Sequence, residues 1–250
     1  MTTTPINGQS GTDNDSANHR SVKQLLMEKR ISIVNDRVSR GVHASKVRSS
    51  GVAWIPEVPD HWKVFPLKYV TKCNQRTLGN DFPSNSEIEY VDIGNVTNRG
   101  IISAREILIF SDAPSRARRL VIKDDIIIST VRTYLRAVAF IEDPPANMVV
   151  STGFAVISCG PMLMPRYAYY QLQSHAFLEQ VVGQSVGVSY PAIAPSKIGR
   201  LPFLVPPLAE QTEIAQSLDD SIGIIDEALD LIDTTQATGI AADVRDDDDE

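Results

Sequence analysis

Two segments with helical periodicity, one near each end of the chain, constrain its fold more than any other feature. In residues 21–41 the apolar residues are spaced by four, three and four: Met27, Ile31, Val34 and Val38. In residues 206–234 they are spaced by four, three, four and three: Leu218, Ile222, Ile225, Leu229 and Ile232. Both spacings predict an amphipathic helix with one apolar stripe. Because a lone helix of this length is marginal in water, each stripe needs a partner.

Opposite charges surround the two stripes. Residues 20–40 contain six basic and two acidic side chains, whereas residues 209–234 contain eight acidic side chains and no basic one. Attraction between unlike helices and repulsion between like ones favour pairing of the two segments with each other. Each exposed ion pair contributes only about 0.3–0.5 kcal/mol, so charge selects the partner and burial stabilises the pair. We therefore predict an antiparallel two-helix spacer that resembles a short coiled coil.

The net charge of −7 does not exclude DNA as a partner, because the acidic residues are concentrated at one end. Residues 209–250 contain 14 of the 31 acidic side chains but only one of the 24 basic ones. The first 208 residues therefore carry a net positive charge, which residues 20–48 supply. A DNA-binding face must then be sought in local clusters of basic residues.

Several classes of protein are disfavoured by what the sequence lacks. It has no run of about 18 apolar residues and no apolar signal at its N-terminus, so we expect a cytoplasmic protein without a membrane partner. It has no phosphate-binding glycine loop, no histidine or cysteine pair with ligand spacing, and no recognisable nucleophile or carboxylate pair. We therefore expect no catalytic residue, no metal and no cofactor of its own. Cys73 and Cys159 are expected to be buried free thiols.

The pattern between the two helical segments predicts a mixed α/β domain. Strand-like runs lie at residues 88–93, 125–129, 136–141 and 154–157, and residues 165–182 have helical periodicity. The sequence Asp143-Pro144-Pro145-Ala146 resembles the base-binding motif of amino-group DNA methyltransferases but lacks its aromatic residue, so we interpret it as a turn.

The chain divides into six parts by composition. In order, we expect a disordered tail at 1–20, a spacer helix at 21–41, a connector at 42–62, a globular domain at 63–205, a second spacer helix at 206–234, and an acidic disordered tail at 235–250. In the connector, Pro56 and Pro59 exclude a regular helix, and Trp54 and Trp62 are expected to hold it on the domain.

Three stretches of the globular domain have residues suited to DNA. Arginines bind phosphate or guanine through paired hydrogen bonds, and hydroxyl, amide and aromatic side chains add further contacts. The candidates are Arg116, Arg118 and Arg119 in the first stretch, Ser129, Thr130, Arg132, Tyr134 and Arg136 in the second, and Gln184, Ser185, Ser189 and Tyr190 in the third. A solvated face with a few ion pairs, or a purely structural loop, explains the same residues about as well. The residues alone leave these interpretations open.

Six motifs in a fixed order give the sequence a family resemblance across residues 21–232. They are SGVAWIPEVPDHW at residues 50–62, PLKY at 66–69, DIIISTVR at 125–132, STGF at 151–154, QSVGVSYPAI at 184–193, and PPLAEQ at 206–211. In this order and spacing they resemble the specificity subunit of type I restriction-modification systems.

The resemblance implies a non-catalytic subunit that reads double-stranded DNA through target recognition domains held between helical spacers. It implies methyltransferase subunits that bring S-adenosylmethionine and methylate adenine, and restriction subunits that bring ATP and magnesium. This chain has one recognition domain where the family has two, which implies a half-subunit or fragment, and a second copy of the chain or another specificity subunit is then a candidate partner. The alternatives are a truncated remnant that docks a methyltransferase without reading DNA, and a cryptic methyltransferase.

Overall fold

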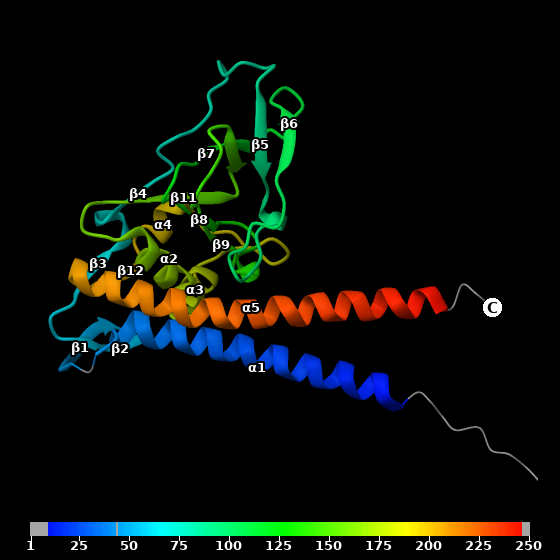
Figure 1. Ribbon diagram of the computed structural model, residues 1–250. Helices are drawn as coiled ribbons and strands as arrows, with labels where there is room; N and C mark the ends of the chain where they lie inside the picture. Colours follow the sequence, from blue (N-terminus) through cyan, green and yellow to red (C-terminus); the bar gives the residue numbers. More distant parts are fainter. Residues whose placement is uncertain (1–9, 44, 247–250) are drawn as a thin grey trace, which may run out of the picture. The chain divides into compact units, whose positions relative to one another are not determined.

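The computed structural model describes residues 10–43 and 45–246, with side chains described from residue 21 to residue 235. The chain forms two compact units (Figure 1). The helical unit contains helix α1 (Ser10–Arg40) as far as Ile33 and helix α5 (Leu208–Asp246) from Ser217 onward. The globular unit contains Val34–Gln216. The two units are described separately below.

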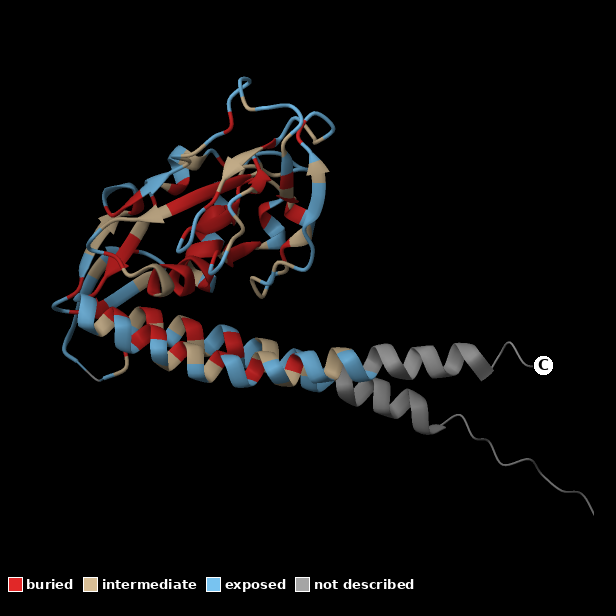
Figure 2. Ribbon diagram, turned by 45° about the horizontal axis from the view of Figure 1, so that its top comes forward, coloured by how far each residue is buried: buried red, intermediate tan, exposed pale blue. Residues whose placement is uncertain are grey.

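In the helical unit, α1 and α5 run antiparallel, as the sequence predicts. Lys23 forms an ion pair with Asp233, and Arg30 Nε lies 3.1 Å from Asp226 Oδ1. As residue numbers increase along α1, those of the partner residues in α5 decrease, so the helices are antiparallel. The predicted stripe of α5 is buried at four positions and half-buried at the fifth, in the order Leu218, Ile222, Ile225, Leu229 and Ile232. Figure 2 shows buried and exposed residues alternating along both helices.

The predicted stripe of α1 is wrong at one position. Met27 is half-buried and Val34 and Val38 are buried, but Ile31 is 40% exposed and its neighbour Arg30 is buried. Consecutive helical residues point about 100° apart, so the partner decides which of the two faces inward. Arg30 faces inward because it pairs with Asp226 and its aliphatic stem tolerates burial.

Both terminal helices extend into segments predicted to be disordered. Helix α1 begins at Ser10 and α5 continues to Asp246, so residues 10–20 and 235–246 are helical. Adding a residue to an existing helix costs much less than starting one, and neither extension contains a proline. The remaining parts of the predicted tails, residues 1–9 and 247–250, lie outside the described residues.

The globular unit is built on two four-stranded sheets. The first has the order β6-β5-β10-β7, with bounds Glu106–Ile109, Glu87–Val91, Met148–Ser151 and Ala117–Leu120. The second has the order β4-β11-β8-β9, with bounds Thr71–Cys73, Phe154–Cys159, Ile126–Ser129 and Val138–Phe140. Only β5 and β10 are parallel among these pairs. Strands β8 and β10 are buried throughout, as the apolar run in β8 predicts.

Two smaller strand pairs complete the unit, and one of them lies within the predicted connector. Strands β1 (Val47–Val52) and β2 (Ile55–Pro59) form a hairpin, and β3 (Lys63–Pro66) pairs with β12 (Pro202–Val205). The prolines of β2 are accommodated because a two-stranded ribbon leaves one edge of each strand unpaired. Trp62 is buried as predicted, whereas Trp54 is 42% exposed.

The helix predicted at residues 165–182 is two helices, α2 (Pro165–Gln173) and α3 (His175–Gly183). Ser174 separates them with extended backbone angles. Its hydroxyl accepts a hydrogen bond from the Phe177 N–H at 3.3 Å and donates one to the Gln171 carbonyl at 2.7 Å. Serine is a preferred N-cap residue, and here Ser174 caps the N-terminus of α3. Short helices α4 (Pro195–Ile198), η1 (Leu67–Tyr69), η2 (Ile93–Asn95) and η3 (Thr133–Leu135) connect the strands.

The remaining expectations concern single residues. Residues 142–147 form the predicted turn between β9 and β10. Both cysteines are free, but Cys73 is exposed because β4 is an edge strand, and Cys159 is half-buried. Burial raises the pKa of the Cys159 thiol to about 12. Among the described residues, no helix combines the length and apolarity that a bilayer crossing requires.

Candidate DNA-binding surface

One hollow of about 460 Å³ in the globular unit brings together residues from all three predicted DNA-binding stretches. Arg116, Arg132 and Tyr190 line it, although they are far apart in the sequence. The other lining residues come from the end of β10 and from the loops after β5, β8 and β10: Asp92, Ile93, Gly94, Val131, Ser151, Thr152 and Gly153. We call this site the hollow.

The segment that follows β8 is fixed by hydrogen bonds to the β10–β11 turn. Thr130 donates from its N–H and from its hydroxyl to the Gly153 carbonyl, each at 2.8 Å, and the Ser129 hydroxyl donates to the Val131 carbonyl. Glycine at position 153 leaves room for the segments on both sides, because a Cβ there would lie 3.2 Å from Val131 Cγ2 and 2.5 Å from Ile93 Cδ1. Ser129 and Thr130 are thus buried and bonded within the chain, so they position the segment and do not face solvent.

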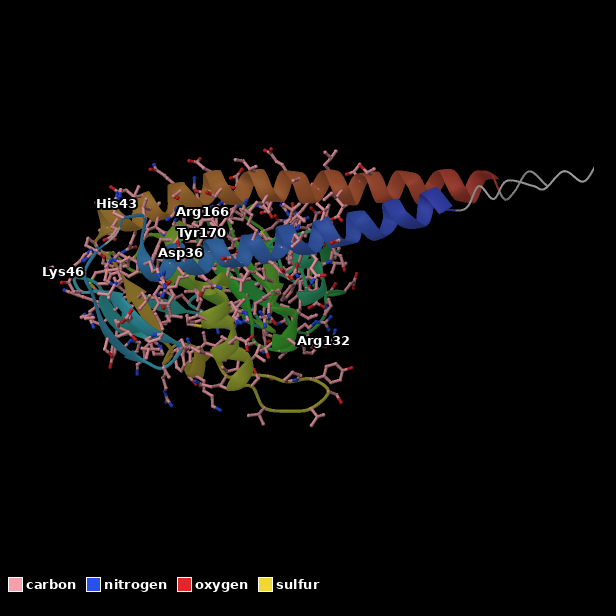
Figure 3. The ribbon with its side chains drawn as sticks, turned by 90° about the horizontal axis from the view of Figure 1, so that it is seen from below. Asp36, His43, Lys46, Arg132, Arg166 and Tyr170 are labelled. Carbon is pink, nitrogen blue, oxygen red and sulfur yellow. The ribbon has the colours of Figure 1, made fainter. Side chains whose placement is uncertain are left out.

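Arg132 occupies a backbone conformation that is rare for residues other than glycine. Its φ is +50°, and Arg136, at the other end of η3, has φ +53°. Such conformations cost on the order of 1–3 kcal/mol each and cluster at binding sites. The Arg132 guanidinium lies 5.0 Å from the centre of the Tyr190 ring, a distance typical of a cation–π contact. Both residues line the hollow. Figure 3 labels Arg132 near the projecting yellow-green loop that contains Tyr190.

Arg116 makes a two-point ion pair with Asp92 across the hollow. The Nε–Oδ1 distance is 3.3 Å and the Nη2–Oδ2 distance is 2.6 Å. Burial raises the pKa of Asp92, but hydrogen bonds from Arg116 and from the Ile93 N–H outweigh it, and the pKa is lowered overall. The hydrogen bond to Asp92 raises the pKa of Arg116. Both groups therefore stay charged at neutral pH.

The three arginines of the first stretch, which the sequence analysis groups together, make contacts with different groups. The Arg118 guanidinium lies 4.6 Å from the centre of the Phe110 ring, whereas Arg119 Nη1 donates to Thr77 Oγ1 at 2.6 Å. Consecutive residues of a strand point to opposite faces, and both arginines are part of β7. Only Arg116 of the three lines the hollow.

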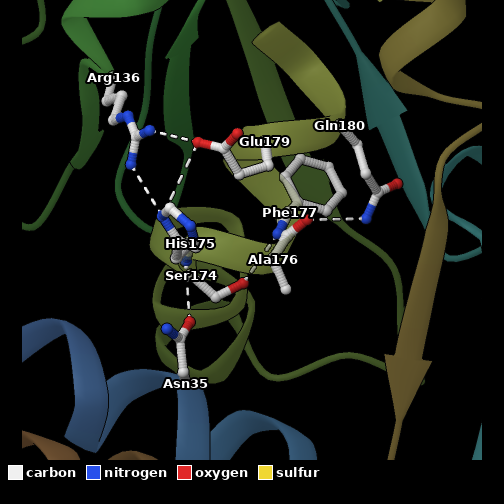
Figure 4. A network of polar contacts seen from close by, with 8 residues as sticks. All are labelled: Asn35, Arg136, Ser174, His175, Ala176, Phe177, Glu179 and Gln180. Carbon is white, nitrogen blue, oxygen red and sulfur yellow. Dashed lines mark hydrogen bonds and ion pairs between the residues drawn. The ribbon is translucent and has the colours of Figure 1, made fainter. Parts of the chain in front are cut away.

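Arg136 belongs to a separate network of polar contacts (Figure 4). Its guanidinium pairs with Glu179 and lies 3.0 Å from His175 Nδ1. The His175 backbone N–H donates to Asn35 Oδ1 at 2.9 Å, so the network joins η3, α3 and the end of α1. Arg136 thus ties these elements together, away from the hollow's lining. Tyr134, within η3, is 53% exposed.

The third stretch forms a loop with a fixed base. Val186 and Ala192 exchange two backbone hydrogen bonds of 2.8 and 2.9 Å, and the Ile193 N–H donates to the Thr130 carbonyl at 2.8 Å. The Ser185 hydroxyl donates to the Val181 carbonyl at 2.7 Å and lies 2.8 Å from the Thr133 hydroxyl. The other candidates in this stretch are exposed: Gln184, Ser189 and Tyr190.

The predicted site omits seven residues of the hollow, and Asp92 and Thr152 are two of them. Asp92 directly follows β5, and Thr152 directly follows β10. The Thr152 N–H donates to the Arg116 carbonyl at 2.7 Å, which brings the two segments together. Because β5 and β10 are parallel neighbours, their carboxyl ends meet at one edge of the sheet. Polar residues just after two buried strands were the available signal, but their pairing was not visible in the sequence.

Known proteins share this arrangement of a mixed domain and terminal helices. Residues 59–231 match the family model for the type I restriction modification DNA specificity domain. The chain therefore belongs to that family. It is 25% identical over 173 residues to the type I restriction enzyme HindI specificity subunit of Haemophilus influenzae, which covers 68% of this chain and 36% of the relative. The chain thus spans about a third of that relative's length.

Solved structures agree with this assignment. The crystal structure of the HsdS subunit from Thermoanaerobacter tengcongensis matches 68% of this chain and 44% of its own, with 25% identity and a TM-score of 0.60. A structure reported for complex assembly and conformational transition of the type I restriction-modification system matches 72% of this chain and 47% of its own, with 25% identity and a TM-score of 0.63. The S subunit from M. genitalium, at 13% identity and a TM-score of 0.51, shares the fold.

Proposed function

We propose that this chain is a specificity subunit with a single recognition domain that reads one part of a DNA target. The observation that carries the proposal is the hollow, where three segments far apart in the sequence place Arg116, Arg132 and Tyr190 together. Arg132 is suited to a phosphate or to the O6 and N7 atoms of guanine. Its αL backbone and its contact with Tyr190 hold the guanidinium in one place, which reduces the entropy lost on binding.

We further propose that the chemistry belongs to partner subunits. Methyltransferase subunits with S-adenosylmethionine would methylate adenine, and restriction subunits with ATP and magnesium would cleave. The helical unit suits a docking or pairing role, because Leu25, Ile224 and Leu231 remain exposed on it outside the buried stripes. Two copies of the chain would present two readers to a symmetric split site. Light scattering of the chain, alone and mixed with methyltransferase, tests this pairing, and a persistent monomer in both samples contradicts it.

The experiment that tests DNA reading is selection from a pool of randomised duplexes, with the full chain alone and with host methyltransferase. Binding is then compared for the selected and the scrambled duplex at about 50 and 200 mM salt, because affinities without a salt concentration cannot be interpreted. We expect the selected duplex to bind at least about 1,000-fold more tightly. Equal affinity for both duplexes contradicts the proposal.

A second function has its own supporting observation. Arg116, Arg119 and Arg136 each already bond to a group of the same chain, namely Asp92, Thr77 and Glu179. A domain whose arginines are satisfied internally fits a remnant that docks a methyltransferase without reading DNA. Retained binding of methyltransferase together with equal binding of all duplexes would support this second function over the first.

A further inference from the structure

The loop beside the hollow presents large apolar side chains to solvent. Val186, Val188 and Tyr190 are 70%, 100% and 66% exposed, and residues 183–191 contain no charged side chain. Single exposed apolar residues are common, but three within five residues form a small exposed patch. Such patches are typical of surfaces that bind a partner.

The loop is held in place at its base while its tip projects. Val186 and Ala192 are joined by two backbone hydrogen bonds, and Val131 and Ala192 form a second bridge to the segment after β8. Gly187 has φ +112°, and a Cβ there would lie 3.2 Å from the Tyr190 carbonyl oxygen. The turn therefore requires glycine, and the chain returns on itself as a narrow ribbon between residues 186 and 192.

The same loop borders the proposed DNA site, which indicates the partner. Tyr190 lines the hollow and lies against Arg132, so a duplex bound at the hollow also meets the loop. The major groove of B-DNA admits a two-stranded ribbon, whereas the minor groove is about half as wide. Within the major groove the apolar group that a base pair displays is the 5-methyl of thymine. An uncharged ribbon with an apolar tip is suited to that methyl group.

We propose that Val188 reads a thymine in the target through contact with its 5-methyl group. This inference rests on the proposed function of DNA reading, and it adds a base and a residue to it. Arg132 supplies a charged contact at the rim of the hollow, while Val188 supplies an apolar contact at the tip of the loop. The fully exposed side chain gains burial only when the duplex is bound.

The test uses the full chain and its selected duplex, in which each thymine is replaced in turn by deoxyuridine. This change removes only the 5-methyl group. We expect one thymine position at which the wild type loses affinity about fourfold, which corresponds to about 0.8 kcal/mol for one buried methyl. In Val188→Ala the thymine duplex should bind more weakly, and the deoxyuridine penalty at that position should disappear. Ile122→Ala, another exposed apolar residue (51%) outside the hollow and the loop, is the matched control and should retain the full penalty.

The other outcomes separate this inference from the proposed function. If a selected duplex exists but no thymine responds to deoxyuridine, or the penalty persists in Val188→Ala, the thymine contact is wrong and DNA reading stands. If Val188→Ala weakens both duplexes equally, the side chain acts in another way, such as a wedge between bases, and the inference also fails. If no duplex is preferred over random DNA, both proposals fail together. Thermal unfolding of Val188→Ala should match the wild type, because the side chain packs against nothing.

Discussion

The helical unit and the hollow differ in how their parts come together. In the helical unit the buried residues of α5 recur at three- and four-residue spacings, and the pairing of the helices follows from their charges. The hollow is built from five short segments whose side chains meet only because β5 and β10 are neighbours and the third stretch folds against the segment after β8. The helical unit thus follows from a repeating pattern along the chain, whereas the hollow forms where segments distant in sequence meet.

The largest effect should come from the repetitive part. Leu229→Ala removes a fully buried side chain of α5 and should lower the free energy of unfolding by about 2–5 kcal/mol. Leu231→Ala, two positions further along the helix and 70% exposed, is the control and should change it by less than about 0.5 kcal/mol. Urea unfolding followed by circular dichroism measures both. Equal effects of the two substitutions would mean that Leu229 is no more buried than Leu231 in the folded protein.

A smaller effect should separate the arginines that converge on the hollow from those that do not. Arg132→Ala should weaken binding to the selected duplex about tenfold, roughly 1.4 kcal/mol, because it removes the cation beside Tyr190. Arg118→Ala removes a charge that packs over Phe110 and should weaken binding by less than about twofold. Fluorescence anisotropy at fixed salt gives both values. A greater loss for Arg118→Ala than for Arg132→Ala would mean that the DNA contacts lie outside the hollow.

The smallest effect concerns stability as a function of pH. The folded pKa of Asp92 lies below its ordinary value of 3.8, so its ion pair with Arg116 stabilises the fold fully above that value. This contribution is lost as the pH falls through the lowered pKa, and it is worth about 1 kcal/mol or less for a partly exposed pair. In Asp92→Asn the difference from wild type should be present at pH 7 and shrink below pH 3.8.

The control for that titration is Asp112→Asn, which changes an exposed carboxylate that accepts a hydrogen bond only from the neighbouring Ser111 among the contacts described. Unfolding midpoints of the three proteins between neutral and acidic pH provide the comparison. A difference between Asp92→Asn and wild type that grows on acidification would have the wrong sign for a lowered pKa.

The sequence predicted the class of fold and the antiparallel helices, because periodicity and charge are local properties of the chain. It did not predict that Arg30 would replace Ile31 on the buried face, since that choice depends on Asp226 of the other helix. It also missed the break at Ser174, where the hydroxyl caps α3 within an otherwise continuous helical pattern. In each case a single contact outweighs a regular pattern.

The candidate site was predicted in part for a related reason. Arg116, Arg132 and Tyr190 were selected by residue type, and the fold brings these three together. Arg118 and Arg119 were selected because they are close in sequence. Both lie in strand β7, where consecutive side chains point to opposite faces, so they do not meet at one site. Asp92 was omitted because its importance comes from its partner Arg116, 24 residues away. Residue type thus selected residues of the hollow more reliably than closeness along the chain did.

The two backbone hydrogen bonds between Val186 and Ala192 have an evolutionary consequence. Backbone groups close the loop, so side chains beyond the closure are free to vary, provided that Gly187 keeps its turn. Residues 188–190 can then be substituted without disturbing the buried sheets. On the proposed function, a new target preference would require a change of a few codons rather than a new domain.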